Sequence, residues 1–280
     1  MTVHHDEGAV TQRAVPGPAL YFTSAMPDNP KAVVGVVHGH ADHGARYAHV
    51  MDFWAARGIG SVAIDLRGHG RATGARGFVT RFEEYLDDTA ELARLVADRA
   101  REAPVFLFGH SMGGLIVALS AIEAPRKWRG VLLSAPYFGL AMDVSAAKKA
   151  AGRIASRLAP RLGLPSGLKG SDMSHDPNRV REHDEDPLVF PHATARWFRE
   201  STKAQARALN RARALTLPLY EVFGTDDRIV SYSAGRRFFD AVGSSDKTFD
   251  ERAGLFHEVL MEYEWEDIAG TMEKWMLARI

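Results

Sequence analysis

The hydrophobic pattern of the chain alternates between short apolar runs and longer segments with apolar residues at helical spacing. Continuous apolar runs, typical of strands buried on both faces of a sheet, cover residues 32–37, 61–64, 105–108, 130–134 and 217–223. Residues 82–100 carry apolar side chains three and four positions apart, which predicts a helix. Further helices are expected before residue 56, after residue 113, and over 233–241 and 265–280. This order predicts an α/β protein with a mostly parallel sheet and helices on both faces.

The pattern changes between residues 137 and 213, where no apolar strand is found. Helices are expected over 143–162 and 193–210, joined by a connector rich in Gly, Pro and Ser over 163–178. We interpret residues 137–213 as an inserted helical cap, and residues 1–136 and 214–280 as the core. Ligands of such sheets bind beyond the carboxyl ends of the strands. The polar residues 1–18 are expected to form a mobile arm before an edge strand near residue 20.

The strand at 105–108 leads into Gly109-His110-Ser111-Met112-Gly113 and then into an apolar helix. This is the G-x-S-x-G pattern of the nucleophile elbow, in which a sharp turn presents the serine hydroxyl to a base and to the substrate. The two glycines allow strand and helix to approach closely around a strained serine. Ser111 is therefore the candidate nucleophile, although the pattern alone also fits an ordinary glycine-rich turn.

Two further candidate residues follow later strands, which gives the chain order Ser111, Asp227, His257. A serine needs a base to take its proton, and the base needs a carboxylate to orient it and to stabilise its charged form. Serine, acid and histidine in this order are typical of α/β-hydrolases. Position alone leaves Asp226 open as the acid, because it is adjacent to Asp227.

The composition of the chain argues against several other classes of function. Basic and acidic residues number 35 each, so nucleic acid is not expected as a partner. With no cysteine in the sequence, disulfides and thiolate chemistry are excluded. No apolar run is long enough for a transmembrane helix, and the first residues carry no apolar signal region. We therefore expect a cytoplasmic protein without cofactor; its oligomeric state is left open.

From about residue 20 onward the chain resembles the monoacylglycerol lipase and lysophospholipase group of α/β-hydrolases. The matching motifs are His38-Gly39-x-x-Asp42-His43-x-x-Arg46-Tyr47, Asp65-x-x-Gly68-His69-Gly70, Gly109-His110-Ser111-Met112-Gly113-Gly114, Ser134-Ala135-Pro136, Asp186-Pro187-Leu188-Val189, Gly224-x-x-Asp227-x-Ile229-Val230 and His257-Glu258. The chain departs from the common pattern at His40, where a small or apolar residue is usual, and at Ala72, where a serine is usual.

The resemblance implies a serine carboxylic-ester hydrolase that acts on monoacylglycerols or lysophospholipids through an acyl-enzyme. It implies Asp227 as the acid, and the N–H groups of His40 and Met112 as the oxyanion hole. It places Asp42 and Arg46 in the substrate-binding region, at the leaving-alcohol end. A general carboxylesterase for small soluble esters is the alternative within this class.

The sequence disfavours two other classes of function, a metal-dependent hydrolase and a non-catalytic binding protein. His38-Gly39-His40-Ala41-Asp42-His43 spells H-x-H-x-D-H, which also occurs in dinuclear metal centres that activate water. The strand before it and Arg46-Tyr47 after it favour the oxyanion loop instead, so no metal site is expected. A non-catalytic binding protein is disfavoured because all three members of the triad are present.

Residues 143–162 form an amphipathic pattern at 100° per residue. Val144, Ala147, Ala151, Ile154, Ala155, Leu158 and Leu162 fall on one side, and Lys148, Lys149, Arg153, Arg157 and Arg161 on the other. A basic amphipathic helix in a cap predicts reversible peripheral contact with anionic membranes. The alternative is an apolar side that packs on the core.

Overall fold

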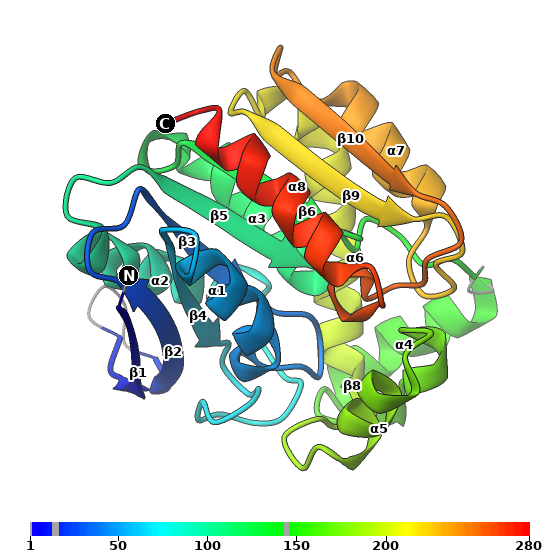
Figure 1. Ribbon diagram of the computed structural model, residues 1–280. Helices are drawn as coiled ribbons and strands as arrows, with labels where there is room; N and C mark the ends of the chain where they lie inside the picture. Colours follow the sequence, from blue (N-terminus) through cyan, green and yellow to red (C-terminus); the bar gives the residue numbers. More distant parts are fainter. Residues whose placement is uncertain (1, 13–16, 143–145) are drawn as a thin grey trace.

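The computed structural model describes residues 2–12, 17–142 and 146–280, and within these residues the centre of the molecule is an eight-stranded sheet (Figure 1). The strand order is β1-β2-β4-β3-β5-β6-β9-β10, and the strands from β4 to β10 run parallel. Only the β1 and β2 pairings, at one edge, are antiparallel. The expected mostly parallel sheet is confirmed. The strands are β1 (Val3–Val10), β2 (Leu20–Pro27), β3 (Ala32–Val37), β4 (Ile59–Asp65), β5 (Val105–His110), β6 (Gly130–Ser134), β9 (Leu219–Gly224) and β10 (Lys247–Arg252).

Each face of the sheet is covered by its own layer of helices, as expected. Along β3, Val33 and Val37 pack into one apolar layer, whereas Val34 and Val36 pack into the other. Side chains alternate between the faces of a strand, so a strand covered on both sides reads as a continuous apolar run. One layer holds α1 (Ala48–Ala55) and α8 (Trp265–Leu277), and the other holds α2 (Glu83–Ala100), α3 (Met112–Glu123) and α7 (Tyr232–Ala241) (Figure 1).

The segment between β6 and β9 interrupts this alternation with mostly helical structure. Its elements are α4 (Ala146–Leu158), α5 (Pro177–Glu185), α6 (Ala195–Arg211) and a small antiparallel pair of β7 (Gly163–Pro165) and β8 (His192–Thr194). Short 3₁₀ turns complete the fold as η1 (Gly44–Tyr47), η2 (Pro125–Lys127), η3 (Gly170–Asp172), η4 (Ala212–Ala214) and η5 (Val259–Met261). We keep the name cap for residues 137–213, and its division from the core stays a prediction.

Three local predictions need correction. The expected mobile arm is wrong for Val3–Val10, which pairs along its whole length with β2; its mostly exposed polar side chains gave no apolar alternation. The predicted connector ends inside helix α5. This helix was not predicted because it has no buried residue and therefore no apolar stripe. The predicted helix over 143–162 ends at Leu158, two residues before Pro160, since the residue before a proline disfavours helical geometry. Its first positions, residues 143–145 with Val144 among them, lie outside the described residues.

Strand β9 carries a buried carboxyl group that has no hydrogen-bond partner within the described chain. Glu221 is fully buried, and both of its carboxyl oxygens lack a partner. A Cβ added at Gly235 of α7 would lie 3.0 Å from Glu221 Oε1, so the carboxyl packs directly against that helix. Burial raises the pKa of Glu221 well above its usual value, against a smaller opposing effect of Arg236. The group is therefore neutral in the folded protein near neutral pH.

Replacing Glu221 by methionine is expected to raise the free energy of unfolding by about 1–3 kcal/mol at pH 8, the usual cost of a buried unpaired polar group. In the wild type the unfolded chain ionises as pH rises above the ordinary carboxyl pKa, whereas the folded chain does not. Wild-type stability should therefore fall between pH 5 and pH 8, and the fall should be smaller in Glu221→Met. Urea unfolding at both pH values measures this difference. The exposed Glu102→Met serves as control, and an equal change in both variants would contradict the expectation.

Candidate active site

Ser111 lies at the turn between β5 and α3 with a strained backbone. Its φ of 52° and ψ of −117° are unusual for a residue with a side chain. A Cβ added at Gly109 would lie 2.3 Å from the carbonyl oxygen of Gly113, and one added at Gly113 would lie 2.1 Å from that of Val37. Both glycines are therefore needed for strand β5, helix α3 and strand β3 to meet around the serine. This is the strand–turn–helix geometry that the G-x-S-x-G pattern predicts.

The loops after β9 and β10 bring Asp227 and His257 together. The distance between His257 Nδ1 and Asp227 Oδ2 is 2.7 Å, and both side chains are buried. The other Asp227 oxygen accepts hydrogen bonds from the N–H groups of Ile229 and Val230. Asp226 instead is exposed and accepts a hydrogen bond from Thr225 Oγ1. Of the two aspartates left open by position, the structure brings Asp227 to the histidine.

The environment of this pair favours a charged imidazole beside a charged carboxylate. Burial by itself lowers the pKa of His257, but the adjacent Asp227 carboxylate outweighs it, and the net pKa is raised. For Asp227, burial acts to raise the pKa, but the combined effect of His257 and the two N–H donors in lowering it is larger, so the net pKa is lowered. An acid that stays ionised and stabilises the imidazolium is what proton transfer from a serine requires.

The His257 ring lies against the residue that precedes the serine. The ring centroids of His110 and His257 are 4.7 Å apart. His110 Nδ1 lies 3.1 Å from Ser134 Oγ, and burial, together with the nearby His257, lowers the pKa of His110 to about 4. His110 therefore stays neutral and does not repel a charged His257 at neutral pH.

The predicted oxyanion groups, His40 and Met112, lie on two segments that meet at the serine. Met112 is the first residue of α3, where an N–H has no acceptor within the helix. A Cβ added at Gly39 would lie 3.5 Å from Ser111 Cβ, so the loop that carries His40 passes directly beside the serine. Developing negative charge is stabilised at such a helix N-terminus.

The His40 side chain faces the cap. This contact could not be predicted from the sequence. Its Nε2 lies 3.1 Å from the carbonyl oxygen of His192, and its ring stacks on Trp197 with centroids 3.8 Å apart. Trp197 Nε1 in turn donates to Met112 Sδ. Burial lowers the pKa of His40 to about 3, so the ring is neutral. The large residue at this position thus connects the oxyanion loop with α6.

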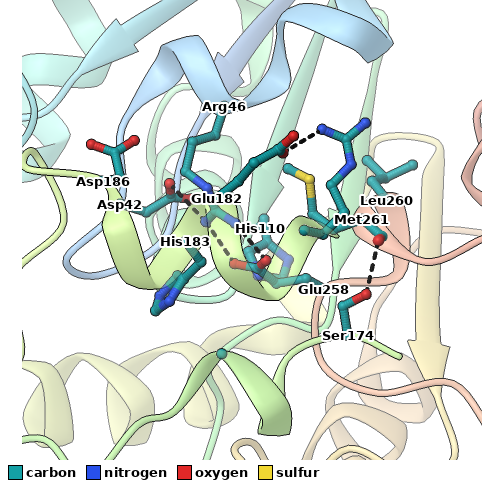
Figure 2. Close-up of polar contacts among 12 residues, drawn as sticks. Asp42, Arg46, His110, Ser174, Glu182, His183, Asp186, Glu258, Leu260 and Met261 are labelled. Atoms are coloured by element: carbon teal, nitrogen blue, oxygen red, sulfur yellow. Dashed lines mark hydrogen bonds and ion pairs between the residues drawn. The ribbon is translucent and has the colours of Figure 1, made fainter. Parts of the chain in front are cut away.

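The predicted substrate-binding residues Asp42 and Arg46 are buried and hydrogen-bonded to protein groups (Figure 2). Arg46 donates two parallel hydrogen bonds of 2.8 Å to Glu258 and one of 3.2 Å to Asp42. Tyr47 donates from its hydroxyl to the second Asp42 oxygen at 3.1 Å. Arg46 also lines a cavity of about 530 Å³ between α5 and the η1 turn. Its other lining residues include His43, Arg179, Glu182, Glu185 and Asp186.

The four side chains of the H-x-H-x-D-H stretch have separate partners. His38 Nε2 accepts a hydrogen bond from the Leu66 N–H, and His43 Nε2 lies 2.8 Å from Asp186 Oδ2. His40 and Asp42 have the partners described above. Within the described residues, no group of three or more His, Cys, Asp and Glu side chains is arranged to hold a metal ion. Each of the four side chains is thus held by a different neighbour.

A segment of the cap, residues 173–175, is hydrogen-bonded to the loop that carries His257. The Glu258 N–H donates to the Met173 carbonyl oxygen at 2.8 Å. Ser174 Oγ donates to the Met261 carbonyl oxygen at 2.9 Å (Figure 2). Glu262, which is almost fully buried, accepts from the N–H groups of His175 and Phe256. No local sequence pattern marks the contacts of residues 173–175, because their partners are more than 80 residues away in the chain.

A parallel sheet covered on both faces, with a strained serine at an elbow and a histidine–aspartate pair whose imidazole lies against the residue before that serine, defines a serine hydrolase of the α/β-hydrolase fold. The sequence model of the family described as serine aminopeptidase, S33, matches residues 28–264. The chain belongs to this family, and it is a serine ester hydrolase.

Several curated relatives and solved structures are similar to this chain over most of its length. It is 34% identical to phospholipase YtpA of Bacillus subtilis over 86% of this chain and 93% of that protein. It is 31% identical to a monoacylglycerol lipase of Mycolicibacterium smegmatis over 95% of both chains. The crystal structure of the Paleococcus ferrophilus monoacylglycerol lipase superposes with a TM-score of 0.84 at 26% identity and covers both chains fully.

Replacing Asp227 by asparagine is expected to lower kcat by roughly 10⁴, as in other triads, because the histidine loses the group that orients it. Asp226→Asn, which removes the same charge one residue away, is the matched control and should leave kcat close to the wild-type value. Steady-state hydrolysis of a p-nitrophenyl ester measures both variants. The reverse ranking would move the acid to Asp226.

Proposed function

We propose that the protein hydrolyses single-chain lipid esters, monoacylglycerols or lysophospholipids, through a Ser111–His257–Asp227 triad and an acyl-enzyme. The observation that carries the proposal is the 2.7 Å contact between His257 and Asp227 beside the strained Ser111. The relatives named as phospholipase and monoacylglycerol lipase support the substrate class. Small soluble esters, as substrates of a general carboxylesterase, are the alternative.

In the proposed mechanism Ser111 Oγ attacks the ester carbonyl carbon while His257 takes the serine proton. The N–H groups of His40 and Met112 stabilise the resulting oxyanion. His257 then gives the proton to the leaving alcohol as the acyl-enzyme forms. Water, deprotonated by His257, attacks the acyl-enzyme and releases the fatty acid and Ser111. Asp227 stays ionised throughout and stabilises the imidazolium.

The cavity beside Arg46, which has charged side chains in its wall, suits the head group of such an ester. Its volume of about 530 Å³ and its charged lining offer hydrogen bonds to a glycerol or to a phosphate-bearing head group. The cavity shares Arg46 with Glu258, which directly follows His257. We infer that Asp42 and Arg46 form part of the wall at the leaving-alcohol end.

Helix α4 supports the proposed contact with membranes. Ile154, Leu158 and Leu162 of the predicted apolar side are 60%, 82% and 47% exposed, so this side does not pack on the core. Arg153 and Arg157 are exposed on the same helix. The side chains of Lys148 and Lys149 are not among those described, and Arg161, the last cation of the predicted basic side, follows the end of α4 and lies over the Phe78 ring. Exposed aliphatic side chains next to cations favour the interface of an anionic bilayer.

None of the described helices combines the length and the apolar character that crossing a bilayer requires. The proposed contact is therefore one in which α4 lies on the membrane surface.

A substrate panel tests the proposed function. Monoacylglycerols and lysophospholipids should give a higher kcat/KM than an ethyl ester of the same acyl length, because the ethyl ester also has an alcohol leaving group but presents no head group to the cavity beside Arg46. Ser111→Ala should retain less than about 1% of activity on every substrate, since a triad acts as a unit. Fatty-acid release, followed at matched acyl length, measures both. Equal or higher kcat/KM for the ethyl esters would favour the general carboxylesterase.

Vesicle binding tests the role of α4. The wild type should co-sediment with vesicles of phosphatidylglycerol and phosphatidylcholine, and salt should weaken the binding because charge attraction is screened. The double variants Arg153→Gln with Arg157→Gln, and Ile154→Ser with Leu158→Ser, should both bind less.

The matched control for the vesicle test is Arg236→Gln with Arg237→Gln, which removes two exposed charges from α7. It should bind like the wild type. Hydrolysis of a short soluble ester should be unchanged in all three double variants. Equal sedimentation of all proteins, or none, would contradict a role of α4 in membrane contact.

A further inference from the structure

The Arg46–Glu258 ion pair is a buried, two-pronged contact close to the proposed base. Nη1 and Nη2 of Arg46 each donate at 2.8 Å to a different oxygen of Glu258. The two side chains are only 9% and 8% exposed. Parallel hydrogen bonds of this kind fix orientation as well as distance, because the planar guanidinium matches the planar carboxylate.

This pair joins two loops that must be aligned for the reaction. Glu258 directly follows His257, so a shift of its carboxylate moves the base. Arg46 belongs to the η1 turn after the loop that carries His40 and Asp42, and Asp42 accepts a hydrogen bond of 3.2 Å from Nη1, which also donates to Glu258. The histidine loop is thereby tied to the oxyanion loop across 212 residues of sequence.

Stability alone does not account for such a pair. Taking two charges out of water costs free energy that their attraction often only offsets, so buried ion pairs are weak evidence for stabilisation. Burial acts to raise the pKa of Glu258, but Arg46 outweighs it and the net pKa is lowered. The carboxylate is therefore charged at neutral pH, and its partner cannot be removed without leaving a buried charge.

We propose that Arg46 and Glu258 are positioning residues that set the imidazole of His257 against Ser111 and the oxyanion loop. Neither residue touches the reacting atoms. The inference rests on the proposed function, in which His257 is the general base. A misplacement of catalytic groups by about 1 Å can cost roughly 100-fold in rate, so a rigid connection between the two loops has a direct effect on kcat.

The titratable groups that face His257 come from four places in the fold, and His110 among them is neutral. Asp227 follows β9, Asp42 follows β3, His110 ends β5, and Glu258 lies on the histidine's own loop; Asp227, Glu258 and Asp42 raise the pKa of His257. Arg46 partly neutralises Glu258 and Asp42. Removing the Glu258 charge while Arg46 remains would therefore lower the pKa of His257.

The first experiment compares Arg46→Lys with Arg67→Lys. Arg67 also holds a buried carboxylate, Asp88, with side-chain exposures of 10% and 0%, and it contacts no residue of the proposed triad. At both sites lysine keeps the positive charge but cannot donate the two parallel hydrogen bonds of the guanidinium. Both variants should lose Tm. On a short soluble ester, which has no head group to contact the cavity, only Arg46→Lys should lower kcat, by about 10- to 100-fold, with a much smaller change in KM.

The second experiment follows kcat/KM for a short soluble ester against pH. His257 must be neutral to act as a base, so activity rises with pH through the pKa of His257. Glu258→Gln keeps the shape of the side chain and removes the charge, so this rise should move to lower pH. Arg46→Lys keeps the charge, so its rise should stay at the wild-type pH. A purely structural role would not separate the two variants in this way.

A fluorophosphonate separates the inference from the proposed function, because it reports serine activation in a single turnover. Wild-type protein should form an adduct at Ser111, located by mass spectrometry, and Arg46→Lys should form it about 10- to 100-fold more slowly. A folded wild type without the adduct would overturn the proposed function. Normal wild-type labelling, with Arg46→Lys as fast as Arg67→Lys and no pH shift in Glu258→Gln, would overturn the positioning role alone.

Discussion

The strained backbone of Ser111 is the constraint on which the rest of the site depends. A non-glycine residue held at φ 52° costs about 1–3 kcal/mol and persists only where its surroundings determine it. Here those surroundings are the carbonyl oxygens of Val37 and Gly113, which leave no room for a Cβ at the two flanking glycines. The close packing of β3, β5 and α3 thus holds the serine in place before any substrate binds. It also fixes where the other groups of the site must lie.

Those other groups come from loops that the parallel sheet collects at one edge. The Asp227 and His257 loops follow β9 and β10, which pair in parallel, so consecutive strands deliver the acid and the base to neighbouring positions. The loop after β3 reaches the serine because β3 pairs with β5. Topology explains why these loops are neighbours, but their final alignment depends on individual hydrogen bonds. The buried ion pair between Arg46 and Glu258 is one of them.

Much of the core could be predicted from the sequence because its signals are local. The apolar run of β3 and the pattern around Ser111 report burial and turn geometry within a few residues. Strand β1 and helix α5 could not be found in this way, since neither buries an apolar stripe. For α5 a usable signal was present: Asp176 accepts a hydrogen bond from the Asn178 N–H, and Pro177 occupies the first turn, as helix starts often do. The contacts of His40 with Trp197, and of Arg46 with Glu258, join residues far apart in the chain, so only the folded structure reveals them.

Residues 173–175, which are attached to the histidine loop, and helix α4 are two parts of the cap whose sequences can change to different extents. One of the hydrogen bonds of residues 173–175 joins the main-chain N–H of Glu258 to the main-chain carbonyl of Met173, and others use the Ser174 hydroxyl or the Glu262 carboxylate, so the attachment depends on the path of the backbone and on these two side chains. An insertion or deletion there would release the segment that positions His257. Helix α4 has no such attachment to the histidine loop among the described contacts. Its length and composition can therefore diverge while the contacts of the histidine loop are retained.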